Sequence, residues 1–301
     1  MNQMIAAGKL FYKYQPINKY LFENLKNNQL YFKNPCEFND PFDSKMKGYY
    51  KGSEQKWNER FSHLIGNDID FQECIRTDVL KLDETNGDLI FDEQLVKKYV
   101  NKLPLTYCLC EENNNILMWS HYADDHTGVC LSFKSKYKPK LPDYEYVLTL
   151  NSESAPIRKV VYNYTIPSPI NLMDKSEFKQ VYKFFLSKFQ GWGYEKEYRI
   201  VLLEPNSQNI NEFEKDELEG VIFGLDIDYK AADEVRRIIE ENYLLKGFNV
   251  NFYKAEPISG EYKIRIVKIK NIDYYIRVIK YKELDKHLRE WVPHYTTDIM
   301  R

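Results

Sequence analysis

The sequence has 301 residues, a formal net charge of −2 and 29% charged residues. This length allows one large domain or two small ones with a substantial core, and the near-neutral charge excludes a general attraction to nucleic acid. The odd count of five cysteines, without a secretory signal, predicts a reducing, cytoplasmic location. No apolar run approaches the ~18 residues of a membrane span, so no membrane partner is expected.

The N-terminal part predicts two strands with a helix between them. Residues 9–14 and 29–34 have the composition of strands, and Asn18 can cap the intervening helix. Residues 35–43 contain two prolines and an Asn-Asp pair, which predict a fixed turn. Residues 45–103 are polar with a weak apolar pattern, which predicts an inserted helical subregion.

The middle of the chain returns to dense apolar patterns. Residues 105–112, 129–134 and 159–164 read as strands, with a short helix or tight bend between the first two. A longer helix is predicted from Asp174, which can cap it, to about Phe189.

The C-terminal part adds strands and helices in irregular order. A buried strand beginning at Leu218 is expected to end at Gly224, and Asp228 can cap the next helix. Two closing strands precede a charged amphipathic helix around residues 281–291. We therefore predict an α+β fold with a mixed, mostly antiparallel sheet. Residues 1–270 would form one domain, and residues 271–301 a helical tail.

The sequence GWGYEKEYRIVL at residues 191–202 contains the strongest candidate site. Residues two apart on a strand share a face, so Glu195 and Glu197 would lie on one side together with Arg199. The two acids could perform acid–base chemistry or hold a ribose, or they could form an ordinary salt-bridge ladder. The adjacent glycines allow a ligand to approach, and Trp192 could stack on a ring.

Three further segments, residues 12–14, 38–43 and 119–125, place polar, aromatic-rich sequence next to turns. Ser120, His121 and Tyr122 could face a ligand, with His121 as general acid or base, or His121 could be a satisfied histidine beside a buried tryptophan. Asn39 and Asp40 could bind a ligand or stabilise their own turn.

The cysteines do not predict a metal site. Cys108, Cys110 and Cys130 are too few for a closed zinc site, so we expect buried free thiols. The sequence also lacks a Walker A loop, a G-x-G-x-x-G motif and a G-x-S-x-G nucleophile motif.

Three long segments resemble one bacterial family. These are LFYKYQPINKYLFENLKNNQLYFKNPCEFNDPFD, CLCEENNNILMWSHYADDHTGVCLSF and WGYEKEYRIV. Together they resemble the family known as domain of unknown function 2971, from Leu10 to about Phe252. The resemblance implies a bacterial cytoplasmic protein, with a connection to phage defence, and carries no established activity.

The order of elements also resembles the ADP-ribosyltransferase fold, which has a split sheet. That superfamily places His or Arg on its first strand, Ser or Tyr in the middle and a catalytic Glu on a late strand. The resemblance implies that Lys13 or Tyr14 takes the first position, Ser120 or Tyr122 the second and Glu197 the third. The chain departs from the pattern because its first strand has neither His nor Arg.

This resemblance implies an ADP-ribosyltransferase or NAD glycohydrolase with NAD as cofactor. Tyr14 and Tyr122 would hold the nicotinamide end, Trp192 would stack nearby, and Glu197 would stabilise the oxocarbenium ion. Glu195 or His121 would assist an acceptor, which could be a macromolecule that the sequence does not identify. Lys13, Ser120 and Asn39 complete the expected binding residues.

Two other classes of function remain open. The first is a non-catalytic module that binds a nucleotide or a peptide in the same cleft. The second is a metal-dependent nuclease, whose candidate residues are Asp40, Asp43, Glu195, Lys196 and Glu197.

Overall fold

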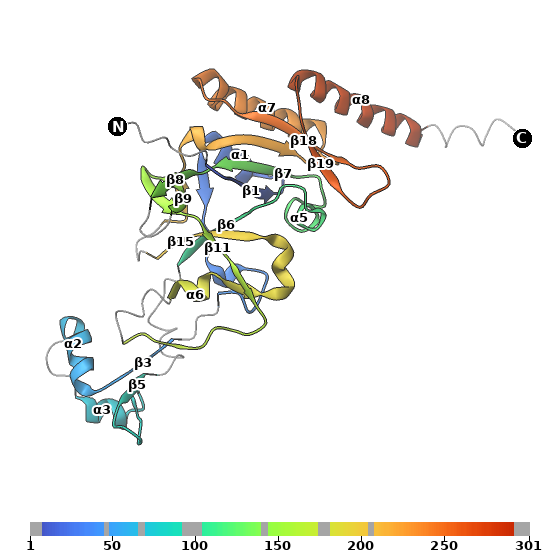
Figure 1. Cartoon of the computed structure of the whole chain (residues 1–301). Helices are drawn as coiled ribbons and strands as arrows, with labels where there is room; N and C mark the ends of the chain where they lie inside the picture. Colours follow the sequence, from blue (N-terminus) through green and yellow to red (C-terminus); the bar gives the residue numbers. More distant parts are fainter. Residues whose placement is uncertain are drawn as a thin grey trace, which may run out of the picture.

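A computed structural model describes residues 8–44, 48–65, 70–91, 104–139, 144–173, 181–203 and 208–291. Its centre is one continuous eight-stranded sheet (Figure 1). The strands, in spatial order, are β11 (Arg158–Lys159), β15 (Glu197–Leu202), β6 (Leu105–Cys110), β1 (Leu10–Gln15), β7 (Val129–Lys134), β17 (Leu218–Phe223), β18 (Asn251–Pro257) and β19 (Ile264–Lys268).

The sheet is mixed and mostly antiparallel, as predicted. Only β17 and β18 run parallel, and all other neighbours in this sheet are antiparallel. The ADP-ribosyltransferase resemblance implied a split sheet, whereas these eight strands are hydrogen-bonded without a break. The chain is therefore an α+β protein built on one broad sheet.

Three helices cover one face of this sheet. They are α1 (Lys19–Lys26), α7 (Tyr229–Asn242) and α8 (Ile272–Trp291), and α7 contacts both of the others (Figure 1). Beneath them lies the largest apolar cluster, which includes Phe11, Phe133 and Phe223. Helix α8 begins earlier than predicted, and Tyr275 stacks on Phe223 at a centroid distance of 5.8 Å.

The opposite face carries the short helix α5 (Ile116–Tyr122). Trp119 is fully buried there and makes an edge contact with Tyr14 of β1 at 5.1 Å. We call this side of the sheet the α5 face. The α5 face also carries the candidate site described below.

Residues 45–103 contain strands as well as the predicted helices. Helices α2 (Glu54–Ile65) and α3 (Phe71–Arg76) accompany strands β3 (Gly48–Gly52), β4 (Lys81–Leu82) and β5 (Leu89–Phe91). β3 pairs with β13 (Ile170–Asn171), giving a four-stranded sheet. The region has its own apolar cluster, formed by Trp57, Phe71, Leu80, Leu89 and Met173. This cluster explains how a weakly patterned segment can fold.

The predicted helix from Asp174 to Phe189 is wrong at its C-terminal end. Helix α6 covers only Val181–Phe185, and β14 (Ser187–Phe189) then pairs in parallel with β12 (Val161–Asn163). Hydrogen bonds to a distant strand here override the helical spacing of the aromatic residues. Residues 174–180 lie outside the described part of the chain.

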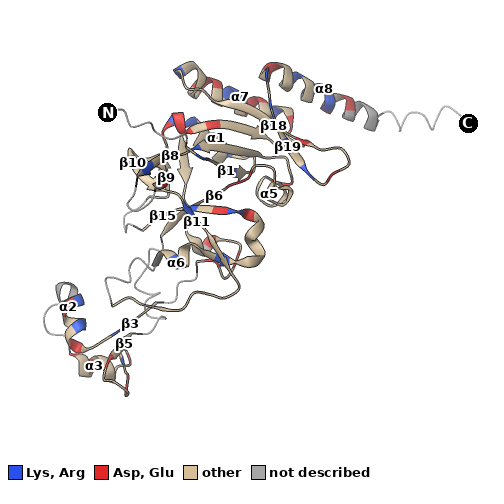
Figure 2. Cartoon of the chain, in the orientation of Figure 1, with Lys and Arg blue, Asp and Glu red and all other residues tan. Residues whose placement is uncertain are grey.

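Two smaller sheets complete the fold. One consists of β8 (Lys136–Pro139), β9 (Tyr144–Leu150) and β10 (Glu153–Pro156), and the other pairs β2 (Gln29–Tyr31) with β16 (Ile210–Glu212). In Figure 2, Lys or Arg positions (blue) and Asp or Glu positions (red) are interspersed along the ribbons of α7 and α8. None of the described helices is both long and apolar enough to cross a bilayer.

Two of the predicted helix caps, Asn18 and Asp228, are present, whereas the predicted cap Asp174 lies outside the described residues. The side chain of Asn18 accepts from Leu21 N, and that of Asp228 accepts from Lys230 N and Ala231 N. We expect Asp228→Ala to lower the free energy of unfolding by about 1 kcal/mol, because two helix N–H groups lose their acceptor. Urea denaturation would measure this loss. The exposed neighbour Asp226 provides the control, and an equal loss in Asp226→Ala would contradict the capping role.

Candidate functional site

The Gly-Trp-Gly segment forms a turn of 3-10 helix rather than the start of a strand. The turn covers Gln190–Glu195, and β15 begins only at Glu197. Between them, Lys196 adopts a left-handed backbone with φ of 46°. The prediction that Glu195 and Glu197 lie on one strand is therefore wrong. Their carboxylates converge by a different route, because the turn brings Glu195 back toward β14.

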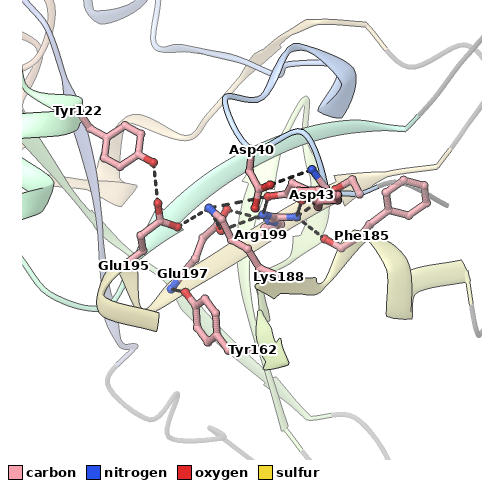
Figure 3. Close-up of polar contacts among 11 residues, drawn as sticks. Asp40, Asp43, Tyr122, Tyr162, Phe185, Lys188, Glu195, Glu197 and Arg199 are labelled. Atoms are coloured by element: carbon pink, nitrogen blue, oxygen red, sulfur yellow. Dashed lines mark hydrogen bonds and ion pairs between the residues drawn. The ribbon is translucent and has the colours of Figure 1, made fainter. Parts of the chain in front are cut away.

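Lys188 of β14 is the group on which the acids converge. Its ammonium contacts Glu195, lies 3.1 Å from Glu197 Oε2 and lies 3.8 Å from Asp43 Oδ2 (Figure 3). The ring of Trp192 lies beside it, with its centroid 5.1 Å from the ammonium. Lys188 thus fills the space between the carboxylates.

Arg199 supplies the second cation. Its guanidinium donates two hydrogen bonds to Glu197, at 2.7 and 2.9 Å, and two to Asp43, at 2.8 and 2.5 Å. A further bond of 2.7 Å reaches the carbonyl of Phe185 (Figure 3). Arg199 is fully buried, so this planar, five-donor group is almost completely satisfied by protein.

The buried ion network contains more acids than bases. We define it as Asp43, Lys188, Glu195, Glu197 and Arg199, each at most 8% exposed. Three carboxylates face two cations, which leaves one formal negative charge in excess. Asp40 lies next to this network (Figure 3), and its buried Oδ2 has no hydrogen-bond partner among the described residues. The site therefore favours a ligand group that is positively charged or donates hydrogen bonds.

The pKa values of the two glutamates are shifted in opposite directions. Burial would raise the pKa of Glu197, but the charges of Arg199 and Lys188 outweigh it and lower the pKa to about 2. Burial raises the pKa of Glu195 above its ordinary value, and repulsion from Glu197 adds to this rise despite the contact with Lys188. Of the two glutamates, Glu195 therefore binds a proton at the higher pH.

These shifts predict how stability depends on pH. A carboxyl with a raised pKa contributes stability below its ordinary value of 4.5, and this contribution is lost as pH rises through the folded pKa. We expect Glu195→Gln to remove this loss. The free energy of unfolding of the variant, relative to the parent, should increase as pH rises above about 4.5. Urea denaturation across the pH range would test this, and parallel curves would contradict the raised pKa.

Tyr122 connects the network to α5. Its hydroxyl donates to Glu195 Oε1 at 2.6 Å, and burial followed by this bond raises the pKa of the phenol. A hydrogen bond with the Asn39 side chain lowers the pKa of the same hydroxyl, but by less than the other two effects raise it. Three residues expected from sequence, Asn39, Tyr122 and Glu195, are thus brought together.

The two residues that precede Tyr122 in α5 point to different surroundings. His121 is exposed, and its ring lies 6.3 Å from those of Tyr122 and Tyr194. Ser120 Oγ instead bonds His126 Nε2 at 3.2 Å. His121 can therefore reach a ligand at the rim, whereas Ser120 is engaged in the turn that follows α5.

The first-strand residues are not adjacent to Glu197. Lys13 lies on the helix-covered side of the sheet, where its ammonium packs over Tyr107 and donates to Cys108 O. Tyr14 lies on the α5 face, is 4% exposed and donates to Glu112 O. The structure thus places Tyr14 in the apolar cluster of Trp119, while Tyr122 contacts the network directly.

Two contacts of the site were missed by sequence reasoning. Lys188 was placed at the C-terminal end of the predicted helix, Tyr162 within the predicted strand at residues 159–164, and neither was given a role. Tyr162 pairs with Lys188 across the two short strands, and its hydroxyl accepts from Glu197 N at 2.8 Å. No local signal marks either residue, because their roles arise from pairing of distant segments.

The described site offers carboxyl, phenol, amide and cationic groups to a ligand. Within the described residues, no group of three or more His, Cys, Asp or Glu side chains is arranged to hold a metal ion. Lys196, the lysine of the nuclease hypothesis, bonds Glu112 on the exterior. The groups that could contact a ligand are Asn39, His121, Tyr122, Trp192 and Glu195.

Comparisons with known proteins give one match. No curated protein and no solved structure matches the chain. Residues 118–200 match the sequence pattern of a family described as "Protein of unknown function (DUF2971)", a narrower range than the resemblance from Leu10 to Phe252. The matched segment contains Tyr122, Lys188, Glu195, Glu197 and Arg199. Residues 118–200 of this chain are thus similar to DUF2971, a family of unknown function.

Proposed function

We propose that the chain cleaves the bond between nicotinamide and ribose in NAD, as an ADP-ribosyltransferase or NAD glycohydrolase. The observation that carries this proposal is the Tyr122–Glu195 pair at the edge of a buried network with excess negative charge. Breaking this bond leaves positive charge on the ribose, and a carboxylate held in a buried site stabilises such charge. The cationic pyridinium of NAD is also complementary to the network.

The residues would divide the work according to their surroundings. Glu195 accepts the proton of the attacking hydroxyl or water, because its raised pKa brings it closer to the operating pH. Tyr122 holds the Glu195 carboxyl by a 2.6 Å hydrogen bond. Trp192 stacks on the nicotinamide ring, and the exposed His121 contacts the acceptor. Glu197, engaged by Arg199 and Lys188, positions Lys188 rather than reacting.

The test is release of nicotinamide from NAD by the purified full chain. We expect time-dependent release, faster with an acceptor if the activity is transfer and independent of it if the activity is hydrolysis. Chromatography of the products with labelled NAD distinguishes the two. Saturable binding of NAD without any release would favour the binding module, and Mg²⁺-dependent cleavage of a nucleic acid would favour the nuclease; either result would overturn the proposal.

A further inference from the structure

A second polar site lies on the same α5 face, at strands β7, β17 and β18 and away from β15. One row of directly paired residues crosses six strands and contains Glu197, Cys110, Tyr12, Ser132, Gly220 and Asn251. Directly paired residues point to the same face, so Tyr12 and Ser132 share the face of Glu197. The row thus connects the ion network at one end with polar residues at the other.

The buried hydroxyl of Ser132 is the first observation that indicates a binding site here. It is 1% exposed, and its Oγ has no hydrogen-bond partner among the described residues. Its neighbour in the row is Gly220, where a Cβ would lie 2.8 Å from the Tyr253 ring. The ring of Tyr253 therefore lies across β17. A buried hydroxyl without a partner calls for an explanation, and a bound ligand is one.

Glu219 provides an acceptor one residue before Gly220, the strand partner of Ser132. Its Oε1 accepts from the Tyr253 hydroxyl at 2.8 Å and from Asn251 Nδ2 at 3.0 Å. Both bonds end on the same oxygen, so Oε2 keeps its capacity to accept from a ligand. The side chain is held in place by a tyrosine and an amide, which is an arrangement suited to binding hydroxyl groups.

A cavity on the same face is linked to this row through Tyr12. It has a volume of about 780 Å³ and lies between residues 112–117 and the hairpin residues 258–266. Asn113 lines the cavity, and its side chain also hydrogen-bonds the Tyr12 hydroxyl. Ile116, Ile264 and Ile266 give the cavity an apolar part, and Asn113, Asn114 and Asn115 supply amides. Charged residues, Glu112, Lys263 and Arg265, also line it, so the cavity offers both apolar contact and hydrogen-bonding groups.

The cavity is also connected to the candidate active site. Asn115 Nδ2 donates to Tyr194 O at 2.8 Å, which joins the turn that lines the cavity to the turn that carries Glu195. A ligand in the cavity would therefore lie beside the same turn that positions the reacting carboxyl.

We propose that this second site binds a ribonucleoside. The ribose hydroxyls donate to Glu219 Oε2, with Ser132 and Tyr12 on the same face, and the base lies against the isoleucines with its edge toward the asparagine amides. The proposal requires neither Glu195 nor any cleavage, so it stands apart from the proposed function. The residues that define the site are Tyr12, Ser132, Glu219, Asn251 and Tyr253.

Calorimetric titration of the full chain with adenosine tests this proposal. We expect saturable binding, and binding of 2′-deoxyadenosine weaker by about tenfold or more, because a hydrogen bond to a charged acceptor is lost. Glu219→Gln should weaken adenosine to a similar extent. Glu212→Gln, an exposed change on β16, is the control and should bind adenosine as the parent does.

Tyr253→Phe provides a second variant that keeps the ring over Gly220 but loses the bond that holds Glu219. We expect it to weaken adenosine binding while the thermal midpoint stays close to that of the parent. If Glu219→Gln does not fold, this variant decides the question. The proposal is overturned if the parent shows no saturable binding, if 2′-deoxyadenosine binds equally well, or if a folded variant of Glu219 or Tyr253 binds adenosine as tightly as the parent.

Discussion

Replacing Arg199 with methionine is expected to lower the free energy of unfolding by about 3–5 kcal/mol. Arg199 is fully buried and donates two hydrogen bonds to each of Asp43 and Glu197. Without the guanidinium, two buried carboxylates lose their main cation, and Lys188 alone faces all three acids. Urea denaturation at neutral pH measures the loss.

Arg265→Met is the matched control for this prediction. Arg265 also pairs with a glutamate, Glu256, but its side chain is 64% exposed. Exposed ion pairs contribute about 0–1 kcal/mol, so this variant should stay close to the parent. Equal losses in the two variants would show that the buried network has no special role in stability.

Replacing Glu195 with glutamine is expected to reduce nicotinamide release by about 100- to 10,000-fold, the usual contribution of a general acid or base. The fold should be retained, because burial already favours the uncharged form of this side chain. The measurement is initial rate with NAD, together with the thermal midpoint of the same sample.

The variant Glu197→Gln distinguishes a carboxyl that reacts from one that positions Lys188. Glu197 binds Arg199 and Lys188, and its pKa is lowered to about 2, so the site depends on its charge. We expect this variant to lose stability by several kcal/mol as well as activity, as is typical of breaking a buried ion pair, about 3–5 kcal/mol. A stable Glu197→Gln protein and an unstable Glu195→Gln protein would reverse the assigned roles.

Local signals in the sequence predicted the local structure well. Asn18 and Asp228 cap helices at the predicted positions, because capping depends on only a few neighbouring residues. The strand at residues 129–134 has the predicted bounds, since a strand buried on both faces gives a mostly apolar run, here interrupted by Ser132. The mixed, mostly antiparallel sheet followed from such segments.

The candidate site could be predicted only in part. Tyr122 and Glu195 were recognised from their neighbours, yet their direct contact depends on the 3-10 turn at Gln190–Glu195. Lys188 was not predicted, because its position depends on the pairing of β14 with β12. This pairing involves three residues of each strand and sets Ser187 opposite Val161, 26 residues earlier in the chain. Pairing between such short strands leaves no pattern in either segment.

The three-stranded sheet of residues 136–156 shows the same limit. No strand was predicted in this segment, whose β8 contains two lysines and a proline. It is held by Glu217, which is 1% exposed and accepts hydrogen bonds from Thr149 N and Thr149 Oγ1. A single buried carboxylate from a distant turn thus anchors a hairpin that the sequence pattern alone does not indicate.

The most direct test of the account is a carbon-13 NMR titration of the glutamate side-chain carboxyls, with Glu195→Gln and Glu197→Gln used for assignment. We expect the Glu195 resonance to titrate above the ordinary pKa of 4.5, whereas Glu197 should stay ionised until the pH approaches about 2. A Glu195 resonance that titrates at or below 4.5 would contradict the claim that this carboxyl is the proton-exchanging member of the buried network.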